Sequence, residues 1–256
     1  MPKQKIFNKE IRMIDDEKYV KYSVEEYRKY IHKIIDRLEN IEPEIIRELC
    51  YFSIIESIAQ DINNYPIRKL QDVFTEFVLK YQNKYNFLGL LDPVTLFYRK
   101  EKELSKYANL DDIQDGGVYF PEDKIIRQIA KQLKCVVMEK LNYKKDNAEK
   151  LLKEHRYVDL LYRLRCRMSH EFYQLGTSKS QFHTEPYYMN CFRMYVKDEQ
   201  IVSENVWTVH IPVIFLRNLC VNCIDNYLDE CIKNNTLPIK NNNLNRICEL
   251  SWYNRS

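Results

Sequence analysis

The sequence predicts a mainly helical protein with a small β-hairpin before the last long helix. Apolar residues recur at intervals of three to four through most of the chain, which is the helical period. The interval changes to two only between Tyr187 and Val209, as in a strand. The 256 residues include only four Gly and eight Pro, so few positions interrupt the helices. With 45% hydrophobic residues, the chain can build one large core or two small ones.

The N-terminal part of the chain predicts two helices. Ser23 and Glu26 form a capping box ahead of an apolar stripe over residues 27–38. Pro43 suits the first turn of the second helix, where its missing N–H has no helical partner in any case. Apolar residues are so frequent over residues 45–59 that we expect this second helix to be nearly fully buried.

Four further helices are expected in the middle of the chain. They cover residues 67–85, 93–107, 121–141 and 145–153. Asp92 and Pro93 begin the second of these, as a capping residue followed by a proline in the first turn. Residues 109–121, which carry Asp-Asp, Gly-Gly and Pro, predict a loop or an insertion.

The C-terminal part predicts a helix, a hairpin and a last helix. The helix covers residues 157–173, and two alternating segments between residues 187 and 209, broken at residues 197–200, predict the hairpin. Pro212 opens an amphipathic helix that ends near Asn234.

The predicted organisation is a single helical domain over residues 23–235. Residues 1–22 mix charges with isolated apolar residues and are expected to be a tail or a loosely docked segment. Residues 236–256 read as a C-terminal extension.

Composition excludes several classes of protein. No glycine-rich phosphate-binding motif can be written with four glycines, and a net charge of +3 means that any basic site is local. No apolar stretch is long enough for a membrane helix, so we expect a soluble, cytoplasmic protein. We also expect the protein to function without a cofactor or metal. The eight cysteines are expected to be free thiols, although Cys220 and Cys223 leave a zinc site as the alternative.

The positive charge gathers in the helix predicted over residues 157–173. On a straight helix Arg163, Arg167 and His170 lie within about 60° of one another, whereas Arg165 points elsewhere. Arg165 joins His170 only if the helix bends, begins or ends between them. Arginine-rich faces are commonly solvated or paired with acids, and Asp159 is nearby.

Arginine and histidine together suit phosphodiester chemistry. The guanidinium is a permanent cation that matches phosphate oxygens, and imidazole moves protons near neutral pH. RNA supplies its own nucleophile, the 2′-OH, so no metal is required for its cleavage. The cluster has one histidine, which therefore acts twice in sequence or is met by its copy in a homodimer. His155 is the nearest additional histidine, and Glu56, on an apolar helix, is expected to pair with an arginine of the cluster if it is buried.

The segment Leu161–Glu171 resembles the signature of HEPN domains, which is an Arg followed by four to six residues and then His. Arg165 gives a spacing of four to His170 and Arg163 a spacing of six, so both fit. Residues 51–60, including Glu56, resemble the buried helix that precedes this signature.

This resemblance implies an HEPN-like helical bundle that dimerises and brings two Arg/His motifs together. The implied activity is metal-independent cleavage of RNA in defence or toxin systems, with an antitoxin or another protein as partner. The implied catalytic residues are Arg165, His170 and Arg163, supported by Glu56, Arg167 and Glu171. The family also has a polar residue after the Arg, where this chain has Cys166 or Leu164. The alternative is therefore a non-catalytic helical module that binds RNA or a protein partner.

Overall fold

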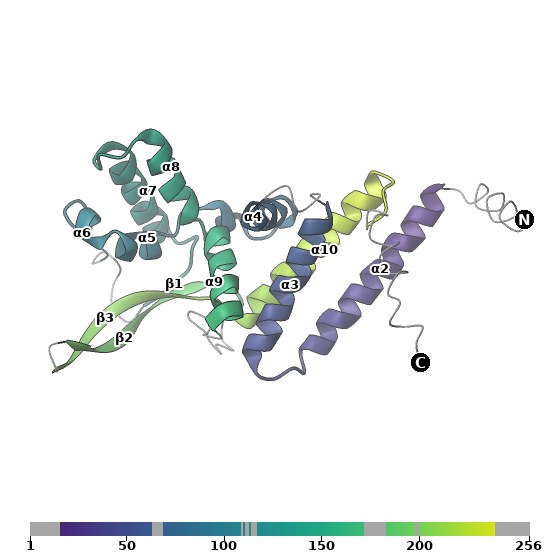
Figure 1. Ribbon diagram of the computed structural model, residues 1–256, viewed down its shortest axis with the longest axis horizontal. Helices are drawn as coiled ribbons and strands as arrows, with labels where there is room; N and C mark the ends of the chain where they lie inside the picture. Colours follow the sequence, from purple (N-terminus) through teal and green to yellow (C-terminus); the bar gives the residue numbers. More distant parts are fainter. Residues whose placement is uncertain are drawn as a thin grey trace, which may run out of the picture. The chain divides into compact units, whose positions relative to one another are not determined.

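The computed structural model describes residues 16–62, 69–108, 110, 113, 117–171, 183–197 and 200–238. Within these ranges the chain forms nine α-helices, one 3₁₀ helix and a three-stranded antiparallel sheet (Figure 1). This confirms the predicted mainly helical class.

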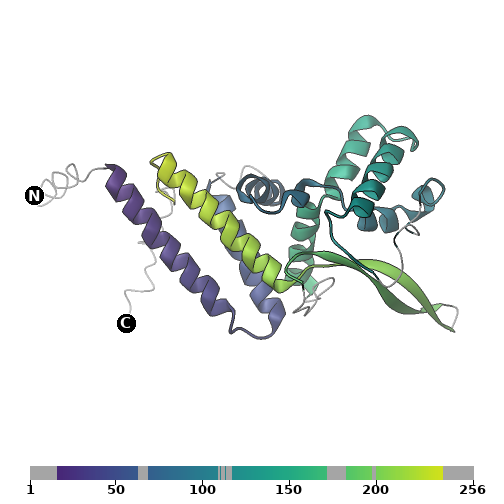
Figure 2. The same cartoon turned by 180° about the vertical axis from the view of Figure 1, so that it is seen from behind.

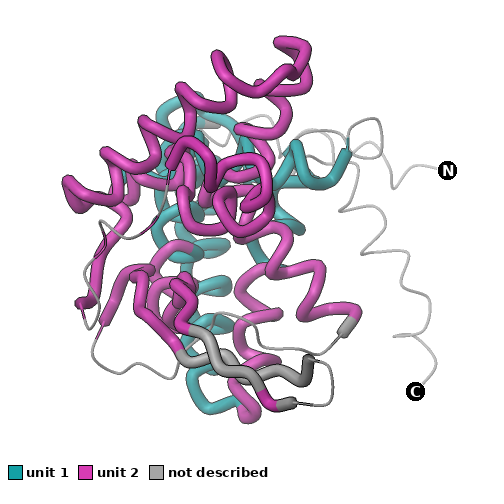
Figure 3. Tube along the Cα trace, turned by 90° about the vertical axis from the view of Figure 1, so that its left-hand side faces the viewer, with its two compact units in different colours: residues 1–41, 53–83, 220–256 teal, residues 42–52, 84–219 magenta. Residues whose placement is uncertain are grey.

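The chain divides into two compact units, shown in different colours in Figure 3. Unit 1 contains residues 1–41, 53–83 and 220–256, and unit 2 contains residues 42–52 and 84–219. Two long helices, α3 (Glu44–Ile62) and α10 (Val213–Lys233), begin in unit 2 and continue into unit 1.

Unit 1 joins α2 (Asp16–Leu38) and α4 (Leu70–Tyr81) to the second part of α10. The guanidinium of Arg28 on α2 lies 3.4 Å from Asp225 and 2.6 Å from Asp229 on α10. Aromatic side chains make the corresponding contact for α4, where the ring centroids of Tyr81 and Tyr227 are 5.4 Å apart.

The predicted start of the first helix at Ser23 is wrong, because α2 begins at Asp16 and Ser23 lies inside it. The buried stripe of this helix starts before the capping box, at Val20, and continues inside it at Val24, so the helix extends through the box. A local capping signal is worth about 1 kcal/mol and is outweighed by the burial of such a stripe. The rest of the predicted tail, residues 1–15, and residues 239–256 of the extension lie outside the described residues.

Unit 2 contains the first part of α3 and most of the shorter helices. These are η2 (Asn86–Gly89), α5 (Pro93–Arg99), α6 (Glu101–Leu104), α7 (Lys124–Glu139), α8 (Lys145–Glu154) and α9 (Tyr157–Glu171). The predicted cap is confirmed, because the Asp92 side chain accepts hydrogen bonds from the backbone N–H groups of Val94 and Thr95. The single helix predicted over residues 93–107 is wrong, since the backbone leaves helical geometry at Lys100 and separates α5 from α6.

The sheet of unit 2 consists of β1 (Val118–Tyr119), β2 (Tyr187–Lys197) and β3 (Gln200–His210), in the order β1-β2-β3. Strands β2 and β3 form the predicted hairpin (Figure 2). Tyr188 lies opposite Val209 and Lys197 opposite Gln200. Strand β1 adds a short third strand within the segment that the sequence predicts as a loop.

Candidate functional site

Backbone hydrogen bonds fix the junction between α8 and α9 against the start of α5. The N–H of Tyr157 donates to the carbonyl of Leu90 at 3.1 Å, and the N–H of Asp92 donates to the carbonyl of His155 at 2.8 Å. A side-chain contact stabilises the first turn of α9: the Nε of Arg156 donates to the buried carboxylate of Asp159 at 2.7 Å. The candidate residues therefore project from a helix with a firmly held start.

Helix α9 is continuous from Tyr157 to Glu171, and one of its faces is apolar and buried. The buried residues of that face recur at helical spacing: Val158, Leu161, Leu164 and Met168. Arg167 and His170 are exposed, and Arg163 is half-buried. Because three and four residues separate neighbours on a helix face, Arg167 adjoins both His170 and Arg163.

The continuous helix does not bring Arg165 to His170. Five residues at about 100° each put these two positions about 140° apart around the axis. The backbone carbonyl of Arg165 accepts a hydrogen bond from Ser169 Oγ at 2.9 Å, within the same helix. The geometry thus groups His170 with Arg163 and Arg167 instead.

The two acidic residues of the predicted site are placed differently. Glu171 is the last residue of α9, and its side chain lies outside the described part of the structure. Glu56 is buried on α3, with 4% of its surface exposed, and belongs to unit 1, whereas α9 belongs to unit 2. Its pairing with an arginine of α9 stays a prediction.

The charge of Arg163 is influenced by two cations, Arg99 and Arg167, and by two carboxylates, Glu154 and Asp92. Its guanidinium donates to the backbone carbonyl of Glu154 at 2.7 Å. Burial lowers the pKa of Arg163, and the positive charges of Arg99 and Arg167 lower that pKa further. A lowered arginine pKa means that nearby carboxylates, of which Glu154 is one, do not offset burial and the neighbouring cations.

Arg99 and Glu154 also line a shallow hollow of about 320 Å³ on one side of α8. The remaining lining residues are mostly polar or basic: Lys100, Tyr143, Asn147, Lys150 and Leu151. Arg99 and Glu154 form an ion pair at 3.6 Å. Both residues also act on the charge of Arg163, Arg99 lowering its pKa and Glu154 raising it. This contribution of α5 and α8 cannot be identified from the local sequence pattern, because it arises from elements distant along the chain.

His155, the nearest additional histidine by sequence, is fully buried, with 0% of its surface exposed. Its Nδ1 donates to the carbonyl of Leu151 at 2.8 Å, and burial lowers the pKa of the ring. Its buried Nε2 has no hydrogen-bond partner among the described residues. A neutral ring sealed in the core does not serve as a second proton carrier at the surface.

The cysteines of the described ranges are all free thiols, as predicted. Cys220 and Cys223 are buried on α10, and burial raises the pKa of Cys223 well above its usual value. Throughout the same ranges, no three His, Cys, Asp or Glu side chains gather in a way that would hold a metal ion.

Comparison of the chain with protein-family models, curated proteins and solved structures finds no match. The resemblance to HEPN domains therefore rests on the residues of this sequence alone. Of the helices in the described part of the chain, none combines the length and apolar character needed to cross a membrane.

Proposed function

We propose that the protein is a metal-independent endoribonuclease of HEPN type that cleaves RNA by attack of the 2′-OH. The observation that supports this most directly is the shared face of Arg163, Arg167 and His170 on the uninterrupted helix α9. Arg167 and His170 are both exposed there, so an RNA strand can reach them without unfolding any element.

A phosphate is the ligand that this face favours. The charges of Arg99 and Arg167 disfavour the charged form of Arg163, whereas the carboxylates of Glu154 and Asp92 favour it, and a bound phosphate would add to the favourable charges. Arginine also presents a planar fork of donors that matches phosphate oxygens. Arg167, one turn from His170, is the guanidinium best placed to hold the phosphate beside the imidazole.

The proposed reaction begins when His170 takes the proton of the 2′-OH. The 2′-oxygen then bonds to phosphorus and the bond from phosphorus to the 5′-oxygen breaks, while Arg167 and Arg163 stabilise the added negative charge. The 5′-oxygen receives a proton as it leaves, and the products carry a 2′,3′-cyclic phosphate and a 5′-hydroxyl. A homodimer that sets the two copies of His170 face to face supplies one base and one acid.

The test is cleavage of labelled single-stranded RNA by the purified protein in EDTA, with His170→Ala as the main variant. Removing the proton carrier should lower the cleavage rate about a hundredfold or more and leave RNA binding largely intact. His32→Ala is the matched control, since it removes a partly exposed histidine from α2 in unit 1. The proposed mechanism would be overturned if His170→Ala cleaved RNA at the wild-type rate. It would also be overturned if the product carried no phosphate at its 3′ end.

One observation favours the second candidate, a non-catalytic helical module that binds RNA or a protein partner. The Arg163 guanidinium is half-buried and already donates to the carbonyl of Glu154, as a structural arginine does. If the protein is such a non-catalytic module, the wild type should bind RNA through Arg167, more weakly at higher salt. It should not cleave RNA even at concentrations at which it forms the dimer. A role in antiviral defence or beside an antitoxin belongs to the first candidate alone.

A further inference from the structure

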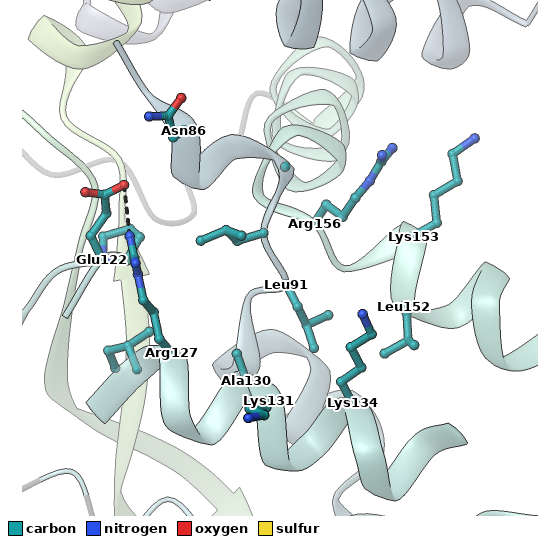
Figure 4. Close-up of a pocket in the computed structure, with 14 residues that line it drawn as sticks. Asn86, Leu91, Glu122, Arg127, Ala130, Lys131, Lys134, Leu152, Lys153 and Arg156 are labelled. Carbon is teal, nitrogen blue, oxygen red and sulfur yellow. Dashed lines mark ion pairs between the residues drawn. The ribbon is translucent and has the colours of Figure 1, made fainter. Parts of the chain in front are cut away.

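A second and larger hollow, of about 510 Å³, lies in unit 2 between α7, the end of α8 and the segment that joins η2 to α5. Figure 4 shows the side chains that line it. Its α8 residues, Leu152 and Lys153, point to the opposite side of that helix from Leu151 and Glu154, which line the smaller hollow. The larger hollow is therefore separate from the basic face of α9.

The floor of this hollow is apolar. It is formed by Leu90, Leu91, Pro121, Ile126, Ala130 and Leu152. Leu90 keeps 40% of its surface exposed, which is high for a leucine beside a well-buried neighbour such as Ile126. Apolar surface open to water in a concave site favours a ligand with an apolar body.

The rim is strongly basic. Five cations line the hollow, Arg127, Lys131, Lys134, Lys153 and Arg156, against the single carboxylate of Glu122. Arg127 lies 3.3 Å from Glu122, and Arg156 binds Asp159.

Lys131 and Lys134 have no ion-pair partner among the described residues, and both are exposed. Together with Arg127 they form a stripe on α7 at spacings of four and three, where like charges repel one another. In Figure 4 Lys134 extends toward Leu91 and Leu152, so an uncompensated cation lies over the apolar floor. A bound anion would relieve this repulsion.

We propose that this hollow binds a small organic phosphate, with its apolar body on the leucine floor and its phosphate held by Lys131 and Lys134. The volume of about 510 Å³ falls within the range typical of small-molecule sites. The floor is aliphatic, so the hollow lacks the aromatic rings on which the bases of single-stranded nucleic acid stack. The site does not depend on the proposed cleavage of RNA.

The test measures binding of three probes to the full-length protein by calorimetry: 1-naphthyl phosphate, 1-naphthol and inorganic phosphate. We expect naphthyl phosphate to bind at least about tenfold more tightly than either of the other two, because only it contacts both floor and rim. Equal binding of naphthol would overturn the role of the lysines, and equal binding of inorganic phosphate would overturn the role of the floor. Displacement of naphthyl phosphate by a single-stranded RNA at lower concentration would instead identify a nucleic-acid surface and overturn the proposal.

Matched variants locate the site. Lys131→Gln combined with Lys134→Gln should weaken naphthyl phosphate about tenfold or more. Lys124→Gln combined with Lys140→Gln removes the same charge from the two ends of α7 and should leave binding within about twofold. Ala130→Leu reduces the hollow without changing charge and should also weaken binding. His170→Ala should have no effect, so failure of this proposal is distinguishable from failure of the nuclease proposal.

Discussion

The hydroxyl of Tyr188 on β2 donates a hydrogen bond of 2.6 Å to the carboxylate of Asp92, the residue that caps α5. Both side chains are fully buried. Tyr188 also contacts the hydroxyl of Tyr157 at the start of α9. Since Tyr188 has one hydroxyl hydrogen and gives it to Asp92, the Tyr157 hydroxyl is the donor in that second contact. A single buried network therefore joins the hairpin, the cap of α5 and the first turn of α9.

Substituting Tyr188→Phe should lower the free energy of unfolding by about 1–3 kcal/mol, because it leaves polar groups of Asp92 and Tyr157 buried without this partner. The measurement is urea denaturation followed by circular dichroism. Tyr107→Phe, which removes a hydroxyl from an exposed tyrosine, is the control and should change the stability by less than about 0.5 kcal/mol. Equal stability of the two variants would contradict an energetic role for the network.

The Asp92 carboxyl should make stability depend on pH. Burial raises the pKa of Asp92, while hydrogen bonds from Thr95, Tyr188 and Val94 oppose that rise. Between the unfolded and folded pKa values the folded state binds more protons, so the free energy of unfolding falls as the pH rises. Asp92→Asn keeps a capping side chain but removes this ionisation.

We therefore expect the stability of the wild type relative to Asp92→Asn to decrease as the pH rises from about 4, the unfolded pKa of aspartate. The difference should become constant above the folded pKa. Glu149→Gln, which removes an exposed carboxylate from α8, controls for general charge effects. A wild-type-minus-variant difference that stays constant across the pH range would contradict the raised pKa of Asp92.

Substitutions of Arg163 and Arg167, which lie on the same face of α9, should have different effects on stability and on RNA binding. Arg163→Ala should lower the free energy of unfolding by about 1–2 kcal/mol, because it leaves the carbonyl of Glu154 without its donor. Arg167→Ala, at an exposed position, should change stability by less than about 0.5 kcal/mol and yet weaken RNA binding. Both are measured by urea denaturation and by fluorescence anisotropy with labelled RNA. Unchanged RNA affinity of Arg167→Ala would exclude this face as the binding site.

The long helices could be predicted from the sequence because each buries a stripe of apolar residues with the helical period. The stripe of α7, for example, contains Ile126, Ile129 and Leu133, all buried. Short elements could not be predicted in this way. Strand β1 has two residues and exists through its pairing with Tyr188 and Met189 on β2, which lie about 70 residues away along the chain.

The features of the candidate site likewise differ in whether the local sequence pattern could predict them. The common face of Arg163, Arg167 and His170 follows from the helical period alone. The burial of His155 and the effect of Arg99 on Arg163 depend on how α5, α8 and α9 pack, which no local pattern specifies. The stripe of Arg127, Lys131 and Lys134 could have been identified from its spacing, but its apolar floor comes from residues near Leu90 and Leu152.

His155 should contribute a loss of stability at acid pH, opposite in sign to Asp92. Burial lowers the pKa of His155 in the folded state, and the unfolded value is about 6.5. Between these two values the unfolded state binds more protons, so the free energy of unfolding falls as the pH is lowered from about 6.5.

The variant His155→Asn retains a donor for the carbonyl of Leu151 but does not titrate. It should therefore lose less stability than the wild type when the pH is lowered from about 7 to about 5. His32→Asn, at a partly exposed histidine of α2, is the matched control. Parallel stability curves for the wild type and His155→Asn would mean that the His155 ring takes up its proton in the folded state as easily as in the unfolded chain, which would contradict the lowered pKa of the buried ring.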